Sequence, residues 1–277
     1  MEKHFELTDK FIVNAFGVKL FQIKCTRNIK WAKAGDLGGW IESENNLSGD
    51  AWVSGNAEVY GDAWVSGNAW VYGNAKVYGD AWVYVNAKVS GNAKVSGNAE
   101  VSGNAEVYGD AEVYGDAEVY GNAKVSGNAK VSGDAWVYGN AKVSGNAKVS
   151  GNAEVSGNAK VSGDAEVSGN AKVSGNAKVY GKAKVSGNAE VSGKAKVSGN
   201  AEVSGNDHHC GFDGFGSCNR HTHAYMTKSG EVEITCGCFS GSIEEFKEQV
   251  HKTHSGTIYE KQYMAIVNVI KIKFGLK

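Results

Sequence analysis

The stretch Gly49-Asp50-Ala51-Trp52-Val53-Ser54 decides the fold, because the chain repeats this six-residue pattern twenty-six times, ending with Gly199-Asn200-Ala201-Glu202-Val203-Ser204. Ala and Val alternate with exposed-type residues (Lys, Glu or Trp, then Ser or Tyr), which is the pattern of a short strand with one buried face. The Gly-Asn or Gly-Asp pair between strands is typical of a turn. The repeat therefore predicts a β-solenoid built from short strands and corners.

A single hexad cannot fold alone. Burying one Val and one Ala contributes roughly 2–3 kcal/mol, whereas ordering six residues costs about 9 kcal/mol. Stacking of successive coils must supply the difference. Three hexads per coil would place equivalent residues eighteen positions apart, in a triangular β-helix about 40 Å long.

The spacing of Val53 and Ala57, repeated along the array, resembles the hexapeptide-repeat signature of left-handed β-helix proteins. The pattern differs from theirs because Gly follows Val by two residues instead of directly. The resemblance implies an all-β solenoid, a left-handed triangular β-helix with 18 residues per coil. A right-handed solenoid similar to bactofilins and a flatter coil of two hexads are the alternatives.

The array divides the chain into three parts. Residues 1–36 are expected to form an N-terminal β cap, with strands at Phe11–Asn14 and Val18–Cys25 in a hairpin. Such a cap would cover backbone groups that the first coil otherwise exposes, and a docking module is the alternative. Gly39-Trp40-Ile41 occupies the place of Ala-Trp-Val, so the solenoid is expected over 37–206.

Residues 207–277 have a different composition and predict a small α+β C-terminal domain. We expect, in order, a loop at Asp207–Ser217, a hairpin of His221–Thr227 and Glu231–Phe239, a helix capped by Ser242 and ending near His254, and a helix over Tyr259–Phe274.

The composition restricts the classes of function. The net charge is −1, which does not favour a nucleic-acid or membrane-surface binder. No apolar run is long enough to cross a membrane, and Met1–Glu6 lacks the features of a signal peptide. Five cysteines are then expected to be reduced thiols in a cytoplasm.

Two outward faces carry candidate binding residues. With three hexads per coil, one face ends in a stack of lysines: Lys124, Lys142, Lys160, Lys178 and Lys196. This stack could bind an anionic partner, or it could be a solvated face that keeps the repeats soluble. Trp52 and Trp70 on that face, and Trp64 and Trp82 on the next, predict either a contact patch or mutual stacking between coils. Val85, Lys182 and Lys194 interrupt the corner residues and are interpreted as drift within the array.

The solenoid has no residues for known β-helix chemistry. Hexapeptide-repeat acyltransferases resemble this array and use a histidine as general base, and γ-class carbonic anhydrases use three histidines for a metal. Here no histidine occurs between His4 and His208. An enzyme active site on the solenoid is therefore not expected.

The C-terminal part holds the chemically rich residues. His221, His223, Cys236 and Cys238 could supply the four ligands of a zinc site. The alternative is structural, since Val232, Ile234, Cys236 and Cys238 alternate onto one strand face as small core residues. A catalytic thiol or histidine in this domain is a third interpretation.

The segments Gly35-Asp36-Leu37-Gly38-Gly39-Trp40-Ile41-Glu42 and Cys236-Gly237-Cys238-Phe239-Ser240-Gly241, with the array between them, resemble a family of uncharacterised phage and prophage proteins. The resemblance implies a phage origin and an accessory role in the cytoplasm of a bacterial host.

These observations favour a non-enzymatic, homo-oligomeric scaffold or interaction module without a cofactor, which presents its end domains or one repeat face to a protein partner. One alternative is a counter-defence inhibitor that binds a host defence protein or sequesters a small anionic or nucleotide signal. The other is an enzyme confined to the C-terminal domain.

Overall fold

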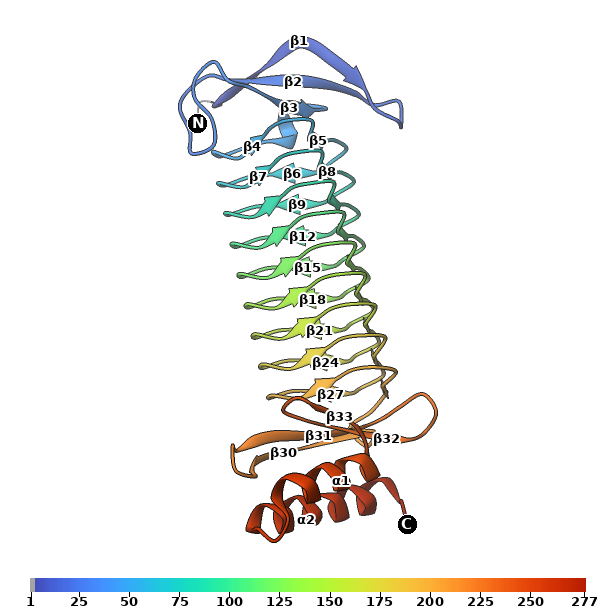
Figure 1. Ribbon diagram of the computed structural model, residues 1–277. Helices are drawn as coiled ribbons and strands as arrows, with labels where there is room; N and C mark the ends of the chain where they lie inside the picture. The colour runs from blue at the N-terminus through green and yellow to red at the C-terminus, as the bar shows by residue number, and fades with distance from the viewer. Residues whose placement is uncertain (1–2) are drawn as a thin grey trace.

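The computed structural model describes residues 3–277 as a straight rod with a small domain across its C-terminal end (Figure 1). Within these residues, three sheets of parallel strands run along the solenoid, one for each side of a triangular coil. Each strand pairs with the strand 18 residues further on, so that Lys124 lies beside Lys142 and Val125 beside Val143. The predicted β-solenoid with three hexads per coil is confirmed.

One side of the solenoid is a sheet of nine strands: β4 (Trp52–Val53), β7 (Trp70–Val71), β10 (Lys88–Val89), β13 (Glu106–Val107), β16 (Lys124–Val125), β19 (Lys142–Val143), β22 (Lys160–Val161), β25 (Lys178–Val179) and β28 (Lys196–Val197). The second side has eight strands: β6 (Trp64–Val65), β9 (Trp82–Val83), β12 (Glu100–Val101), β15 (Glu118–Val119), β18 (Trp136–Val137), β21 (Glu154–Val155), β24 (Lys172–Val173) and β27 (Glu190–Val191).

The third side belongs to a sheet of twelve strands that also includes the N-terminal cap. Its strands are β1 (Phe5–Val13), β2 (Lys19–Cys25), β3 (Leu37–Ile41), β5 (Glu58–Val59), β8 (Lys76–Val77), β11 (Lys94–Val95), β14 (Glu112–Val113), β17 (Lys130–Val131), β20 (Lys148–Val149), β23 (Glu166–Val167), β26 (Lys184–Val185) and β29 (Glu202–Val203).

The Ala and Val positions of the hexads form the core. Ala123 and Val125 are fully buried, as are their equivalents along almost the whole rod. The strands are only two residues long, so backbone bonds between coils carry much of the order; the N–H of Lys142, for example, donates to the carbonyl of Ala159 at 2.9 Å. Small core residues keep the coil narrow, and the outward positions are left free to vary.

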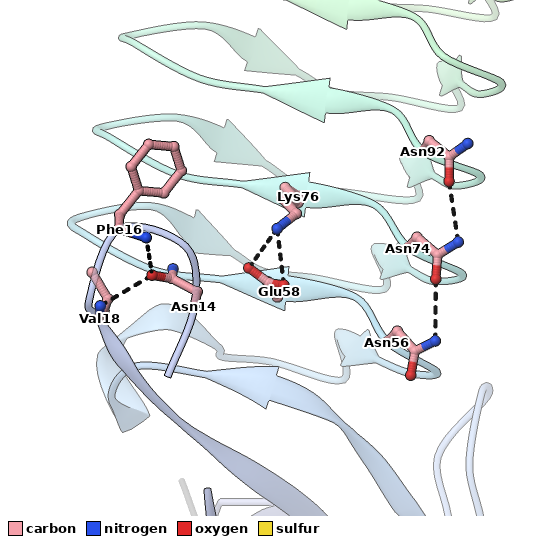
Figure 2. A network of polar contacts seen from close by, with 8 residues as sticks. All are labelled: Asn14, Phe16, Val18, Asn56, Glu58, Asn74, Lys76 and Asn92. Carbon is pink, nitrogen blue, oxygen red and sulfur yellow. Dashed lines mark hydrogen bonds and ion pairs between the residues drawn. The ribbon is translucent and has the colours of Figure 1, made fainter. Parts of the chain in front are cut away.

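The corners require glycine. Gly139 has φ +70°, and a Cβ atom there would lie 3.1 Å from the backbone N of Gly157 in the next coil. Val85 adopts the same conformation, with φ 67°, where a branched side chain is strained. Amide ladders run along the corners, and Figure 2 shows Asn56 donating to Asn74 at 3.1 Å and Asn74 donating to Asn92 at 3.1 Å.

The N-terminal cap extends the twelve-stranded sheet. β1 and β2 form an antiparallel hairpin, β2 pairs with β3, and β3 continues in parallel into β5. In the turn, Asn14 Oδ1 accepts from the N–H groups of Phe16 (2.9 Å) and Val18 (3.0 Å) (Figure 2). The hairpin was expected, but its first strand begins at Phe5 instead of Phe11. A 3₁₀ helix, η1 (Glu44–Asn46), precedes the first complete coil.

The C-terminal domain is an antiparallel sheet in the order β30 (His209–Phe215), β31 (Arg220–Met226), β32 (Val232–Cys236) and β33 (Phe239–Ser242), with helices α1 (Ile243–His254) and α2 (Ile258–Phe274). The sheet lies across the end of the solenoid and the helices lie beyond it (Figure 1).

Both predicted helices are confirmed, and Ser242 caps α1 by accepting from the N–H of Glu245. The expected loop at Asp207–Ser217 is wrong, because the aromatic residues of this Gly-rich segment form β30 along the edge of β31. Within residues 3–277, neither of the helices combines the length and the apolar character needed to cross a membrane.

Candidate functional site

The five lysines that the repeat places on one face stack on the nine-stranded sheet. Lys124, Lys142, Lys160, Lys178 and Lys196 are neighbours in register on β16, β19, β22, β25 and β28. Adjacent strands lie about 4.8 Å apart, so the Cα atoms of successive lysines are separated by one strand spacing. We call these five residues the lysine ladder.

The lysines of the other two sheets have acidic neighbours. Lys76 donates to Glu58 at 2.9 Å (Figure 2), Lys130 lies 2.9 Å from Glu112, and Lys172 lies 3.6 Å from Glu154. Along the described part of the chain, by contrast, no carboxylate lies within ion-pair distance of the three central rungs, Lys142, Lys160 and Lys178.

This difference has an energetic consequence. Like charges directly opposite each other on neighbouring strands are destabilising. The corner before the central rungs carries neutral amides, with Asn122 donating to Asn140 and Asn140 to Asn158. On the corner after them, Asp164 accepts from Asn146, and the ion pairs within residues 3–277 include none between Asp164 and a rung. The ladder therefore keeps its mutual repulsion, which an anionic partner would relieve.

An acidic residue ends the ladder on the N-terminal side. Lys124 Nζ lies 2.7 Å from Glu106 Oε2. The hydrogen bond from Lys124 lowers the pKa of Glu106, and the same bond raises the pKa of Lys124. The unpaired part of the ladder thus begins at Lys142.

At the C-terminal side the ladder runs into a basic cavity of about 290 Å³, the junction cavity, between the last coil and the C-terminal domain. Its cationic lining residues are Lys194, Lys196 and Arg220. Lys196 Nζ donates to the carbonyl of Gly237 at 2.7 Å, which fixes the last rung against the turn between β32 and β33. Lys194 stands at a corner where the repeat normally has Asn or Asp.

The four candidate tryptophans divide into two groups. Trp52 is 2% exposed and belongs to the core, with the ring of His4 from the cap 6.2 Å away, so its prediction as an outward contact residue is wrong. Trp70 is half-buried and stacks on Trp31 with ring centroids 4.8 Å apart. On the eight-stranded sheet, Trp64 and Trp82 are exposed and meet edge to face at 5.6 Å.

The four residues proposed for zinc do not converge. His221 and His223 point from β31 toward the solenoid, where His223 contacts Lys196. Cys236 lies on the opposite face of the sheet, where Tyr263 of α2 is its neighbour, with O and S 3.8 Å apart. Cys238 was expected on the core face, but it is exposed because Gly237 and Cys238 form the turn between β32 and β33. Among residues 3–277 no three His, Cys, Asp or Glu side chains are grouped as metal ligands would be.

A chain of imidazoles lies between the C-terminal sheet and the last coil. His223 Nδ1 donates to the carbonyl of Lys196 at 3.0 Å, and burial lowers the pKa of His223 to about 3. Its Nε2 is therefore unprotonated and accepts from His209 Nδ1 at 3.0 Å. The pKa of His209 is also lowered, first by burial and then by Lys273. The contact of His223 with Lys196 attaches the domain to the solenoid, and His209 holds the His223 ring in place.

No sequence pattern pointed to Arg220, because it follows a turn that belongs to no motif. Lys194 did carry a signal, since it breaks the Asn/Asp corner pattern beside the lysine ladder, and its interpretation as drift overlooked its place in the junction cavity.

Comparison with known proteins adds no family to this description. No model of a protein family matches the chain, and no curated protein matches it either.

Proposed function

We propose that this protein is a non-enzymatic interaction rod of the bacterial cytoplasm that binds an acidic partner protein along the lysine ladder. The observation that carries the proposal is the contrast between sheets. On the other two sheets every lysine of the hexad strands has a Glu on at least one neighbouring strand, as Lys130 has Glu112, whereas Lys142, Lys160 and Lys178 form an unbroken positive stripe. An acidic surface would neutralise this stripe and gain favourable long-range attraction.

The ends of the rod support a scaffold role. The hairpin of β1 and β2 covers the first coil, and the sheet β30–β33 covers the last (Figure 1). The end strands of the first and last coils are thereby covered, which does not favour polymerisation by direct stacking of coil on coil. The partner is then expected to bind along the side of the rod.

A protein partner fits better than single-stranded nucleic acid. Sites for single strands combine cations with aromatic platforms on which bases stack. The outward residues after the Val of β16, β19 and β22 are Ser126, Ser144 and Ser162. Of the five ladder strands only β25 is followed by an aromatic residue, Tyr180, and a single ring is no platform for successive bases. A host defence protein with an acidic surface is the partner class we propose.

Binding of poly-L-glutamate, measured by fluorescence anisotropy at low and physiological salt, tests this function. A variant with Lys142→Gln, Lys160→Gln and Lys178→Gln should bind about tenfold more weakly than the wild type. The matched control carries Lys130→Gln, Lys148→Gln and Lys184→Gln on the twelve-stranded sheet and should bind almost as the wild type does. Equal losses of affinity in both variants would refute binding at one specific face. Tighter binding of oligo-dT than of poly-L-glutamate would favour nucleic acid as the partner.

The junction cavity supports a second candidate, capture of a small phosphorylated signal. Lys194, Lys196 and Arg220 supply three cations from two parts of the fold. Calorimetric titration with AMP and with inorganic phosphate tests it, using Lys194→Asn, which restores the residue of the repeat. Binding that survives this substitution unchanged would exclude the junction cavity as the site.

A further inference from the structure

A second cavity, of about 380 Å³, lies inside the C-terminal domain between the sheet and the two helices. Its size is within the range of small-molecule sites, which are mostly apolar with a few placed polar groups. Phe239 of β33 and Phe246 of α1 line it, together with Tyr263 of α2. We call it the aromatic cavity.

The aromatic rings that line the cavity pack against one another and give it a largely aromatic wall. Phe246 lies 5.3 Å from Phe239 and 5.6 Å from Tyr263, the latter edge to face, and His254 lies 5.8 Å from Tyr263. Aromatic groups at such angles offer both faces and edges to a flat ligand, and each pair contributes about 0.5–1.5 kcal/mol beyond area burial.

The charge of the residues that line the aromatic cavity favours a ligand with an anionic group. Arg220 is the lining residue with a permanent charge, and the residues that line the cavity include no carboxylate. Over residues 3–277 no carboxylate lies within ion-pair distance of Arg220. A guanidinium presents a planar fork that binds carboxylate or phosphate through two hydrogen bonds.

The turn beside Arg220 leaves room for its side chain. Gly237 has φ +64°, and a Cβ atom there would come within 2.7 Å of Arg220 Nη1. On the other wall, burial raises the pKa of Tyr263 to about 12, and its hydroxyl oxygen lies 3.8 Å from Cys236 Sγ.

We infer that the aromatic cavity binds a small aromatic anion, with its ring packed against the aromatic residues that line the cavity and its carboxylate or phosphate on Arg220. This inference is independent of the lysine ladder, because it uses none of its residues. The shared chemistry is a flat ring with one anionic group, which an aryl carboxylate or an aryl phosphate provides.

Saturation-transfer NMR with benzoate, phenyl phosphate and benzylamine tests the inference on the full chain. Benzoate or phenyl phosphate should give saturable signals, and whichever binds identifies the anionic group. Benzylamine has the same ring with a positive charge and should give none. Saturable binding by neither anion, or equal binding of benzylamine, would overturn the inference.

Substitutions test whether the ligand binds in the aromatic cavity or elsewhere on the protein. Arg220→Gln should abolish the saturable signal, and Arg27→Gln at the other end of the rod is the control of equal charge change. Thr253→Trp, at an exposed position of α1 that lines the cavity, should also block binding while keeping Arg220. Lys194→Asn should leave it intact, because Lys194 lines only the junction cavity. Unchanged signals in Arg220→Gln, or competition by inorganic phosphate as strong as by phenyl phosphate, would contradict the assignment.

Discussion

His223 Nδ1 lies 3.0 Å from the carbonyl oxygen of Lys196, and this contact joins the C-terminal sheet to the last rung of the lysine ladder. Thr235 Oγ1 donates to the same carbonyl at 3.3 Å, and Tyr225 and Ser198 share a hydroxyl contact at 3.1 Å. The domain is therefore held to the solenoid by buried hydrogen bonds of His223, Thr235 and Tyr225, which we call the polar seam. This attachment depends on a neutral His223.

Acidification should weaken this seam. The pKa of His223 falls from 6.5 to about 3 on folding, because burial disfavours the charged ring. The unfolded chain therefore binds the proton first. The contribution of His223 to stability is complete above pH 6.5 and decreases toward pH 3, by at most about 1.4 kcal/mol per pH unit.

Urea unfolding of the wild type and of His223→Gln between pH 7.5 and 4.5 measures this effect. Gln can donate to the carbonyl of Lys196 without titrating. The free energy of unfolding should fall more steeply with decreasing pH in the wild type than in the variant, and parallel profiles would show that His223 does not control the seam.

Replacing Val85 with glycine should increase the stability of the protein. Its φ of 67° is the left-handed conformation that the corner glycines adopt, and its side chain is 45% exposed, so little burial is lost on removal. Val85→Gly should raise the free energy of unfolding by about 1 kcal/mol, because strain is relieved. Gly139→Val is the reverse control and should destabilise by about 1–3 kcal/mol. A Val85→Gly variant less stable than the wild type in thermal unfolding would mean that Val85 makes a favourable contact.

Trp31 should hold the N-terminal cap in place. It stacks on Trp70, and its Nε1 donates to the carbonyl of Asn68 at 2.7 Å. Trp31→Ala should cost about 2 kcal/mol and loosen residues 3–41. Hydrogen exchange should then accelerate in the cap and stay unchanged near β16 to β28, whereas Trp136→Ala, at an exposed position of the rod, should alter neither region. Faster exchange along the whole solenoid would contradict a local role.

The repeat determines what the sequence could predict. Period-two alternation and a period of eighteen residues place Val125 beside Val143 and Lys142 beside Lys160, and both follow from counting. The failures occur where the repeat ends. The burial of Trp52 depends on the cap, a contact between segments of different pattern.

The C-terminal domain shows the same limit. The strand period alone places Cys238 on the core face, but a turn at Gly237 intervenes and exposes it. Arg220 and Phe246 reach one cavity from distant positions in the sequence, and no local spacing indicates that meeting. Tertiary contacts between non-repeating segments are the part that periodicity does not encode.

Two deletions of one coil each provide the most direct test of the lysine ladder as the functional face. Removing residues 91–108 brings Lys88 next to Lys124 and gives six stacked lysines, whereas removing residues 139–156 leaves four. Both rods lose 18 residues and become equally long, and their thermal unfolding confirms that they fold. The deletion of residues 91–108 should bind poly-L-glutamate at low salt about tenfold more tightly than the other deletion. Equal affinities would contradict the account and would reduce the rod to a spacer.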